Sequence, residues 1–472
     1  MENIRADICV IGAGSGGLSV AAGAAQLGRK TVLIEKGEMG GDCLNAGCVP
    51  SKALLAAAAR AQTIREAPAF GIDAEPRIDA ARVHAHVREI IAEIAPNDSQ
   101  ARFEKLGVKV IRALAHFIDA NTVEAGATRI RARRFVIATG SRPTIPPIPG
   151  LESVPYFTNE TIFNKDFVPP HLAIIGGGPV GLELAQAHRR LGANVTVIEM
   201  ARILPHEDEE AAGVVRAALE REGIHILENT HATAIRPTAN GLGIQLVSQN
   251  GSEILEPSHL LVATGRAPNI EDLDLAAAGI NADARGIAVD HRLKTSNSRV
   301  YAIGDVTPAP RFTHVANYHA GLVIRRALFC MPIRAEYSAI PRVTYTDPEL
   351  AQVGLTEDEA RARHTRVTIA RADFAQNDRA VIERRGEGFA KLVLGKGGRI
   401  LGATIVGAHA GELVQPWAVA LHRRIDLSAI AAMTVAYPTL SEIGKRAAGN
   451  YFTPLIFSRR AKALARLLSL FG

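Results

Sequence analysis

Short apolar runs recur along the chain, and two of them lead into similar glycine-rich turns. Residues 7–11 run into the turn 12–17, and residues 171–175 run into the turn 176–181. In each copy a stretch rich in small residues follows, and then a second apolar run that ends in an acidic residue, Glu35 or Glu199. Strand, glycine turn, helix and second strand are the parts of a dinucleotide-binding βαβ unit. The pattern therefore predicts two units of the Rossmann type.

The glycines of each G-x-G-x-x-G turn have separate physical tasks. The first allows the tight turn, the second lets the backbone approach a pyrophosphate, and the third lets helix and strand pack closely. The helix N-terminus attracts the phosphate, and the acidic residue accepts hydrogen bonds from a ribose. The glycines are Gly12, Gly14 and Gly17 in the first copy, and Gly176, Gly178 and Gly181 in the second. Because each copy has its flanking elements, two chance glycine turns are a poor alternative.

Proline content and a change in pattern mark the domain boundaries. Residues 143–150 are too rich in proline for a helix or a central strand. After about Ser338 the predicted strands and helices become shorter. We predict an α/β chain with two Rossmann-like domains and a C-terminal α+β domain. Their limits are 1–149 with 271–338, then 150–270, then 339–457, followed by a basic amphipathic tail at 458–472.

Composition narrows the class of protein. The 472 residues are 47% hydrophobic and 22% charged, with a net charge of +6 and 5% aromatic residues. Nucleic-acid binding would need clustered basic and aromatic side chains, so we expect none. No run approaches the ~18–20 apolar residues of a membrane span, and the N-terminus does not read as a signal peptide. Four cysteines in so long a chain do not form a secreted disulfide framework, so we expect a cytoplasmic protein.

Two cysteines stand out as candidate chemistry. Cys43 and Cys48 lie in residues 40–52, ahead of an alanine-rich helix expected over residues 53–62. With Gly47 between them, the two sulfurs can approach in a bent turn. The nearby helix start and Lys52 would stabilise a thiolate. The sequence offers no second cysteine pair or His-x3-His to complete a metal site, so we expect no bound metal and favour a redox role.

Residues 40–52 and the duplicated fingerprint together resemble the class I pyridine-nucleotide disulfide oxidoreductases. This family includes dihydrolipoamide dehydrogenase, glutathione reductase and mercuric reductase, and the resemblance extends to about residue 457. It implies an FAD-binding domain at 1–149 and 271–338, an NAD(P)-binding domain at 150–270, and a homodimerisation domain at 339–457. It also implies electron transfer from NAD(P)H through FAD to a Cys43–Cys48 disulfide, and on to a small thiol, disulfide or metal-ion acceptor.

The resemblance also assigns roles to single residues. Cys48 would face the flavin, Cys43 would exchange with substrate, and Lys52 would lie near the flavin with Glu183 as partner. Asp305 would hold the ribityl chain, and His314 or His319 could contact FAD, although a buried core histidine explains His319 equally well. The cofactor-binding positions are Gly12, Gly14, Gly17, Glu35, Lys36, Gly41, Asp42, Lys52, Ala115, Thr139, Gly140, Gly176, Gly178, Gly181, Glu199, Gly265, Asp305 and His314.

The coenzyme preference rests on Glu199. A carboxylate at this position repels the 2′-phosphate of NADPH and accepts from a free 2′-hydroxyl, so we predict NADH, with NADPH as the weaker coenzyme. Arg202 lies nearby in sequence and could soften this preference.

The C-terminal motif departs from the family pattern. In dihydrolipoamide dehydrogenase and glutathione reductase a histidine precedes Pro-Thr and, oriented by a glutamate, serves the partner subunit's thiols as acid and base. Here Tyr437 precedes Pro438 and Thr439, and Glu442 is kept. The usual pKa is ~10 for tyrosine and ~6.5 for histidine, so Tyr437 stays protonated at pH 7 and accepts protons poorly. We predict slow oxidation of dihydrolipoamide.

Several functions remain open at this point. Tyrosine at this position resembles mercuric reductase, but residues 450–472 lack that enzyme's cysteine pair, and we expect no N-terminal metal-binding domain. A mercuric-reductase-like acceptor is the leading hypothesis. The alternatives are a dihydrolipoamide dehydrogenase of a 2-oxoacid dehydrogenase complex, and a membrane-associated electron-transfer or binding flavoprotein. Tyr437 could also reflect drift in an enzyme whose acid and base groups lie elsewhere.

Two charged segments complete the sequence-based expectations. In the tail, Leu464, Leu467, Leu468 and Phe471 recur at helical spacing among basic residues, which predicts an amphipathic helix. Such a helix can contact a membrane surface, but docking on its own dimer or fraying is the simpler expectation. The acidic run 207–210 is expected to be the solvated first turn of a helix.

Overall fold

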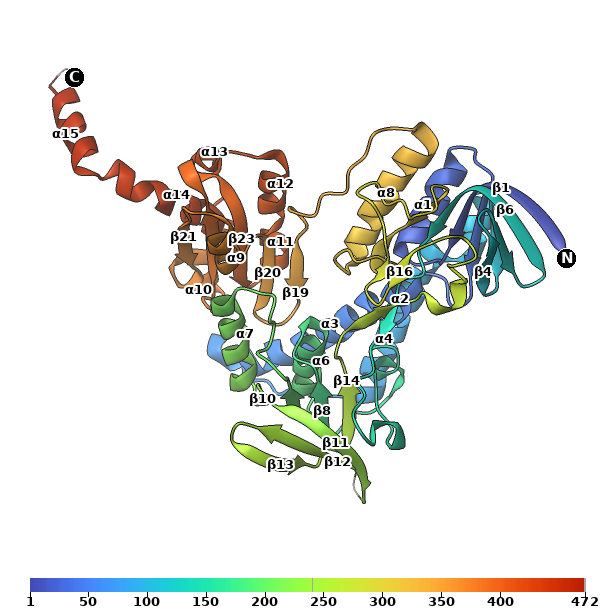
Figure 1. Cartoon of the computed structure of the whole chain (residues 1–472). Coiled ribbons are helices and arrows are strands. Elements are labelled where there is room, and N and C mark those ends of the chain that lie inside the picture. Colours follow the sequence, from blue (N-terminus) through green and yellow to red (C-terminus); the bar gives the residue numbers. More distant parts are fainter. Residues whose placement is uncertain (240, 471–472) are drawn as a thin grey trace. The chain divides into compact units, whose positions relative to one another are not determined.

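The computed structural model describes residues 1–239 and 241–470, and it divides into two compact units (Figure 1). The first comprises Met1–Gly176, Ala187–Val195 and His231–Ala335, and the second Gly177–Gln186, Thr196–Thr230 and Glu336–Gly472. Helices and strands alternate through the first part of the chain, and an antiparallel sheet with helices follows. The predicted α/β fold with an α+β C-terminal part is confirmed. The domain limits drawn from the sequence stay a prediction.

The first unit is built on a sheet of order β3-β2-β1-β6-β5-β4, with β18 beside β6. Its parallel strands are β1 (Glu2–Ile11), β2 (Thr31–Glu35), β3 (Val108–Arg112), β6 (Thr128–Ile137) and β18 (Val300–Ala302). The antiparallel strands are β4 (Ala115–Asp119) and β5 (Thr122–Ala125). The helices are α1 (Ser15–Gln26), α2 (Gly41–Asn45), α3 (Cys48–Glu66), α4 (Ala80–Ile94), α5 (Gln100–Lys105) and α8 (Thr313–Phe329).

Both faces of this sheet are buried, which explains why its central strands are apolar at successive positions. In β1, Ile8 and Val10 belong to one core cluster, and Cys9 and Ile11 belong to the other. This alternation follows from side chains that point to opposite faces of a strand. Burial on both faces is typical of parallel sheets covered by helices. Cys9 is fully buried, and this burial raises the pKa of its thiol far above the usual range.

The second glycine fingerprint belongs to a four-stranded sheet of order β10-β9-β8-β14. Its elements are β8 (His171–Ile175), α6 (Pro179–Arg190), β9 (Asn194–Ile198), α7 (Glu209–Arg221), β10 (Ile224–Leu227) and β14 (His259–Val262). An antiparallel sheet contains β11 (His231–Thr238), β12 (Gly241–Ser248) and β13 (Gly251–Leu255). Two short antiparallel pairs add β7 (Ser141–Pro143) with β15 (Arg266–Pro268), and β16 (Ala282–Asp283) with β17 (Gly286–Ile287).

The C-terminal part contains a five-stranded sheet of order β19-β20-β23-β22-β21. Its strands are β19 (Arg342–Thr344), β20 (Glu349–Gly354), β21 (Thr368–Asp373), β22 (Phe389–Leu394) and β23 (Ile400–Gly407). The helices are α9 (Glu357–Arg363), α10 (Asp378–Ile382), α11 (Ala410–Leu413), α12 (Gln415–Arg423), α13 (Leu427–Ala432), α14 (Glu442–Ile456) and α15 (Arg459–Leu468). Phe374, Trp417 and Ile443 lie together in its core.

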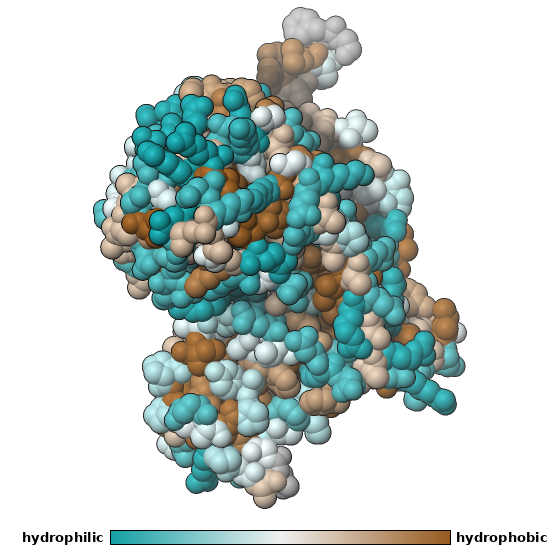
Figure 2. Space-filling model, turned by 90° about the vertical axis from the view of Figure 1, so that its right-hand side faces the viewer, coloured by the Kyte–Doolittle hydropathy of each residue, from teal (hydrophilic) through white to brown (hydrophobic). Residues whose placement is uncertain are grey.

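Among the described residues no helix is both long enough and apolar enough to cross a bilayer. On the face shown in Figure 2, hydrophobic residues lie in separate groups among hydrophilic ones.

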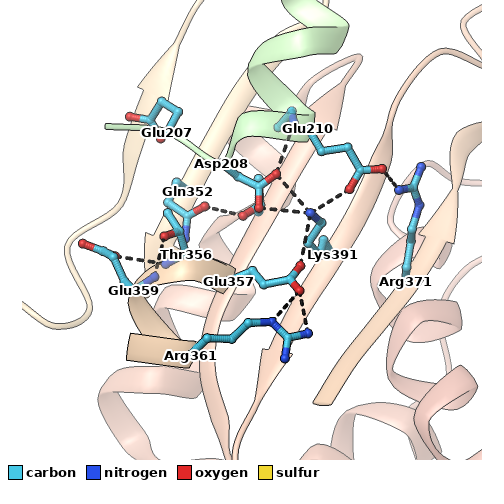
Figure 3. Close-up of polar contacts among 12 residues, drawn as sticks. Glu207, Asp208, Glu210, Gln352, Thr356, Glu357, Glu359, Arg361, Arg371 and Lys391 are labelled. Atoms are coloured by element: carbon cyan, nitrogen blue, oxygen red, sulfur yellow. Dashed lines mark hydrogen bonds and ion pairs between the residues drawn. The ribbon is translucent and has the colours of Figure 1, made fainter. Parts of the chain in front are cut away.

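The acidic run 207–210 differs from the expected solvated turn. Glu207 and Asp208 are 8% and 5% exposed. Asp208 caps α7, because its carboxylate accepts from the backbone N–H of Ala211 at 3.2 Å. The Nζ of Lys391, on β22, lies 3.0 Å from Asp208 and 2.7 Å from Glu210 (Figure 3). Glu209 and Glu210 are exposed in the first turn of α7, as expected. The expectation was wrong for Glu207 and Asp208, because partners far away in sequence neutralise their charges, a fact that local pattern does not reveal.

Candidate functional site

The two cysteines lie on consecutive helical elements of the first unit. Cys43 is in α2, and Cys48 is the first residue of α3. The bend between them depends on Gly47, because a Cβ there would come within 2.8 Å of the Asp42 carboxylate and 3.0 Å of its carbonyl oxygen. Both cysteines are thiols rather than a disulfide in this structure, Cys43 half-buried and Cys48 exposed. The helix expected over 53–62 thus begins earlier, at Cys48 itself.

Cys48 is placed to be a thiolate. A hydrogen bond from the Cys43 thiol lowers the pKa of Cys48 to about 6, and the Thr313 hydroxyl and the charge of Lys52 act in the same direction. The Cys48 Sγ lies 3.4 Å from the Thr313 Oγ1. The N-terminus of α3 adds a partial positive charge at the same sulfur. At neutral pH the Cys48 sulfur is therefore negatively charged.

Cys43 holds the proton that the pair shares. Its hydrogen bond to Cys48, together with burial, raises the pKa of Cys43 beyond the usual range. The pair therefore divides into one thiol and one thiolate. The roles that the family resemblance implies, with Cys48 toward the flavin and Cys43 exchanging with substrate, stay predictions.

Lys52 lies one helical turn after Cys48 on α3, so both side chains share a face of that helix. Glu183 lies on α6 in the second unit, where its carboxylate accepts from the backbone N–H of Tyr345 at 3.0 Å. The pairing of Lys52 with Glu183 stays a prediction.

A chain of polar contacts connects the cysteine segment to Asp305. Arg266 lies 3.3 Å from the carboxylate of Asp42 and donates to the Ser141 hydroxyl at 2.7 Å. That hydroxyl donates to the Asp305 carboxylate at 2.7 Å. Asn159 also donates to Asp42, at 3.1 Å. Burial raises the pKa of Asp305, while Ser141 and Arg266 act in the opposite direction.

The sequence reasoning missed Arg266, Ser141, Asn159 and Thr313. The first three lie in β15, in β7 and in a loop, far from the cysteines along the chain. Thr313 begins α8 just after Asp305 and stands beside His314, which we did single out. Because Ser141 directly follows Gly140 and Arg266 directly follows Gly265, inspecting the neighbours of the predicted positions could have found Thr313, Ser141 and Arg266, but not Asn159.

The first glycine turn fits a pyrophosphate. Gly12 has a φ of +104°, and a Cβ there would come within 2.4 Å of the Ala138 carbonyl oxygen. A Cβ on Gly17 would come within 1.9 Å of the Gly12 carbonyl oxygen, as close helix–strand packing requires. A Cβ on Gly14 would meet only the Gly41 Cα, at 4.0 Å, so this backbone is open to a ligand at the start of α1. The turn is held by Glu35, whose carboxylate accepts from Ala13 N at 2.6 Å and Gly37 N at 2.7 Å.

The second glycine turn has the same construction. A Cβ on Gly176 would come within 2.4 Å of the Ala263 carbonyl oxygen, whereas one on Gly178 would meet nothing within 4 Å. The Glu199 carboxylate accepts from Gly177 N at 2.7 Å and Ala201 N at 3.0 Å. Arg202 donates instead to backbone carbonyls of Leu204, Pro205 and Glu207. Its guanidinium is thus already engaged. Gly181 lies in α6, and its packing role stays a prediction.

The remaining cofactor positions lie mostly at strand ends or on loops. Thr139 donates to Asn269 O at 2.7 Å, and Gly140 and Gly265 have φ values of +69° and +126° with open space around them. Ala115 is buried at the start of β4, and Lys36 pairs with Asp272 at 2.8 Å. The ligand contacts of these residues stay predictions.

The two candidate histidines differ in their surroundings. His314 is exposed, and its ring stacks on Phe312 at 5.1 Å between centroids. His319 is fully buried, and its Nδ1 accepts from Gly304 N at 3.1 Å. Burial lowers the pKa of His319 to about 4, so it is a neutral core histidine that supports the turn before Asp305.

Tyr437 has a partner that the sequence did not indicate. Its hydroxyl donates to the Asp378 carboxylate at 2.9 Å, and this bond raises the pKa of Tyr437. Glu442, the first residue of α14, accepts from Thr439 N at 3.2 Å. The hydrogen bond of the phenol therefore goes to Asp378, and Glu442 fixes the backbone of the same turn. No local sequence signal connects Asp378, at the start of α10, with this turn.

Two family models match the chain. The pyridine nucleotide-disulphide oxidoreductase model matches residues 6–320, and the dimerisation domain of the same family matches residues 340–448. A dihydrolipoyl dehydrogenase of Thermus scotoductus is 38% identical over 450 residues, covering 92% of this chain and 95% of the relative. A mercuric reductase of Streptomyces lividans is 35% identical over 457 residues, covering 94% of this chain and 96% of the relative.

A solved structure is also similar to this chain. It is the Cu(II) complex of the HOCl-induced flavoprotein disulfide reductase RclA from Escherichia coli, with a TM-score of 0.83 and 26% identity over 92% of this chain and 98% of that one. Proteins of this kind use FAD and NAD(H), and the two glycine turns fit these groups.

Proposed function

This chain belongs to the pyridine nucleotide-disulphide oxidoreductase family, and we propose that it uses NADH to reduce a thiophilic metal ion or a small disulfide. It is an FAD-dependent oxidoreductase with a disulfide redox centre, as the sequence predicted. The dimerisation domain indicates a homodimer, also as expected. The nature of the acceptor, the choice of NADH and the cytoplasmic location belong to the proposal.

One observation carries the choice of acceptor, namely the hydrogen bond from Tyr437 to Asp378. That hydrogen bond raises the pKa of Tyr437, so the phenol keeps its proton at neutral pH. Because the phenol is protonated at neutral pH and its O–H donates to Asp378, Tyr437 cannot readily accept a proton from a dithiol substrate. Oxidation of dihydrolipoamide needs such a base. Delivery of electrons to a metal ion does not.

The protons and electrons balance for transfer from NADH to the acceptor. FAD, when bound, supplies the chemistry that accepts the hydride of NADH and passes its two electrons to the Cys43–Cys48 disulfide. The reduced pair is one thiol and one thiolate, so the single proton of the hydride stays on Cys43 and no proton from solvent is needed. A two-electron metal ion such as Hg(II) then takes both electrons, the Cys43–Cys48 bond forms again, and one proton leaves to solvent. A disulfide acceptor instead takes both electrons, the Cys43 proton and one proton from solvent by thiol–disulfide exchange.

The cysteine pair is suited to hold a soft acceptor. Thiolates are the preferred ligands of soft metal ions, and Cys48 is a thiolate at neutral pH. Thr313 and Lys52 stabilise that charge without adding a competing nucleophile. Loss of the Cys43 proton on binding a metal ion would complete a dithiolate.

The choice of NADH rests on Glu199 and Arg202. The Glu199 carboxylate is held at the second glycine turn by two backbone N–H groups, where it would face the adenosine ribose. Arg202, the nearest cation in sequence, is engaged by three carbonyl oxygens. It is therefore not available to neutralise a 2′-phosphate.

An anaerobic acceptor screen tests the proposal. The FAD-loaded enzyme is mixed with NADH and Hg(II), Cu(II), glutathione disulfide or lipoamide, and the reverse reaction is run with dihydrolipoamide and NAD. We expect the highest kcat/KM for a metal ion or glutathione disulfide, and its loss in Cys43→Ser. A higher kcat/KM for dihydrolipoamide than for every other substrate would overturn the proposal.

The role of Tyr437 has its own test. Tyr437→His restores a base with a pKa near 6.5, so oxidation of dihydrolipoamide should become about tenfold faster or more. Tyr437→Phe removes the hydroxyl and adds no base, so it should leave that slow rate unchanged. An equal rate in Tyr437→His and in the wild type would show that Tyr437 does not limit the reaction.

A further inference from the structure

The end of the chain carries basic residues and no acidic ones. From residue 443 to residue 472 there are six lysines and arginines and not one aspartate or glutamate. Four of the six, Arg459, Arg460, Lys462 and Arg466, lie on α15. This segment therefore has a local charge of +6, equal to the net charge of the whole chain.

The helix α15 is well defined at its start. Ser458 caps it, since its hydroxyl accepts from Ala461 N at 3.2 Å. The helix continues from the end of α14 (Figure 1). Capping by serine and the run of alanine, leucine and arginine both favour a helix in this segment.

The side chains of α15 separate into two faces. Leu464, Leu467 and Leu468 recur at intervals of three and four residues and share one face, whereas Phe471, also predicted for this face, lies outside the described residues. The three leucines are 56%, 55% and 58% exposed. Lys462 and Arg466 lie four residues apart on the opposite face, and none of the described side chains of α15 is buried.

The neighbouring helix α14 is built differently. Its Ile443, Ala447 and Ala448 are buried in the core of the C-terminal sheet. The last residues of α14 and the residue after it, Leu455, Ile456 and Phe457, are again exposed, at 60–64%. The apolar surface of α15 thus extends back to the point where α14 leaves the core.

We propose that α15 binds the surface of a membrane that contains anionic lipids. In this arrangement the leucine face enters the boundary between headgroups and acyl chains, and the basic side chains contact the lipid phosphates. Charge decides between this occupant and a second copy of the chain. A second copy has the same net charge of +6 and offers no overall complement, whereas an anionic surface does. The proposal replaces the sequence-based expectation that the tail docks on its own dimer or frays. The proposal does not depend on which electron acceptor the enzyme uses.

The loss of vesicle binding on charge reversal can be calculated from the number of basic residues changed. Each basic side chain near an anionic surface strengthens binding about fivefold at moderate salt. Reversal of two basic residues to glutamate changes the charge of the tail by four units. Binding to anionic vesicles should therefore weaken by a factor between about 100 and about 600. Because the attraction is screened over about 10 Å at 0.1 M salt, 1 M NaCl should weaken it strongly.

The experiment is a sedimentation assay with the full-length, FAD-loaded protein and two kinds of vesicle. The anionic vesicles contain phosphatidylcholine and phosphatidylglycerol at about 7:3, which gives them a negative surface. The neutral vesicles contain phosphatidylcholine alone. The variants are Lys462→Glu with Arg466→Glu, and Leu464→Ser with Leu467→Ser. The matched control is Lys396→Glu with Arg399→Glu, which changes the net charge equally at two exposed residues outside the tail.

We expect wild type and the control to pellet with the anionic vesicles and not with the neutral ones, and both tail variants to stay in the supernatant. NADH oxidation by every variant should equal that of the wild type, because no described side chain of α15 is buried. Equal pelleting of wild type and both tail variants would overturn the proposal. So would dissociation of the dimer by Leu464→Ser with Leu467→Ser in analytical ultracentrifugation, which would show that α15 covers a second copy.

Discussion

The Thr313 hydroxyl offers the sharpest test of how the protein charges the Cys48 sulfur. Thr313→Val removes the hydroxyl that lies 3.4 Å from the Cys48 Sγ and keeps the shape of the side chain. A hydrogen bond to a charged group contributes about 1.5–3 kcal/mol when buried. Cys48 is exposed, so solvent screens the interaction, and we take about one pKa unit as the effect. The pKa of Cys48 should rise from about 6 to about 7.

The sign of the pH dependence follows from the lowered pKa. Cys48 is a thiolate above pH 6 and becomes protonated as the pH falls through that value. At pH 6.5 the thiolate fraction should drop from about 0.76 in the wild type to about 0.24 in Thr313→Val, for pKa values one unit apart. The long-wavelength charge-transfer absorbance between thiolate and flavin reports this fraction in the NADH-reduced enzyme, titrated anaerobically between about pH 5 and pH 8.

Two further variants control the experiment. Thr313→Ser keeps the hydroxyl and should titrate like the wild type. Thr63→Val removes a hydroxyl that donates to Ala59 O in the same helix, about 22 Å from Cys48 along α3, and should also have no effect. An unchanged midpoint in Thr313→Val would refute the assignment of Thr313 as a donor to Cys48.

Three other predictions follow from the packing and the charges. Gly17→Ala should lower the Tm of the FAD-free protein, because its Cβ would come within 1.9 Å of the Gly12 carbonyl oxygen; Gly14→Ala should keep that Tm and weaken FAD binding, measured by fluorescence titration. Glu199→Gln should lower the ratio of kcat/KM for NADH to that for NADPH about tenfold or more, since a charged hydrogen-bond acceptor is lost and repulsion of a 2′-phosphate is relieved. Lys391→Met should cost about 3–5 kcal/mol of stability in urea unfolding, because Asp208, Glu210 and Glu357 lose their common cation, whereas exposed Lys396→Met should stay within about 0.5 kcal/mol; equal midpoints for the two would contradict the role of this cluster.

Short sequence patterns predicted the elements whose structure depends on residues close together in the chain. The two glycine fingerprints and their acidic residues follow from the geometry of one tight turn, so Glu35 and Glu199 could be identified within about 25 residues of each glycine turn. The cysteine pair and Lys52 lie on one short segment for the same reason. The apolar strands of the first sheet could be recognised because both of its faces are buried.

Contacts between distant segments could not be predicted in this way. Asp378 and Tyr437 are 59 residues apart, and Lys391 and Asp208 are 183 residues apart. An acidic run such as 207–210 has the same sequence pattern whether solvent or a buried lysine neutralises it. Arg266 and Ser141 likewise reach Asp42 and Asp305 only once β7 and β15 have paired.

The central claim is that electrons from NADH reach the Cys43–Cys48 pair, with Cys48 as the thiolate beside the flavin. Anaerobic titration of the FAD-loaded enzyme with NADH tests it most directly, with wild type, Cys43→Ser and Cys48→Ser compared at pH 8, about two units above the pKa of Cys48. We expect a long-wavelength charge-transfer band in the wild type only after NADH is added, a band in Cys43→Ser already before NADH because this variant forms no disulfide, and no band in Cys48→Ser. A band of undiminished intensity in Cys48→Ser would contradict the claim.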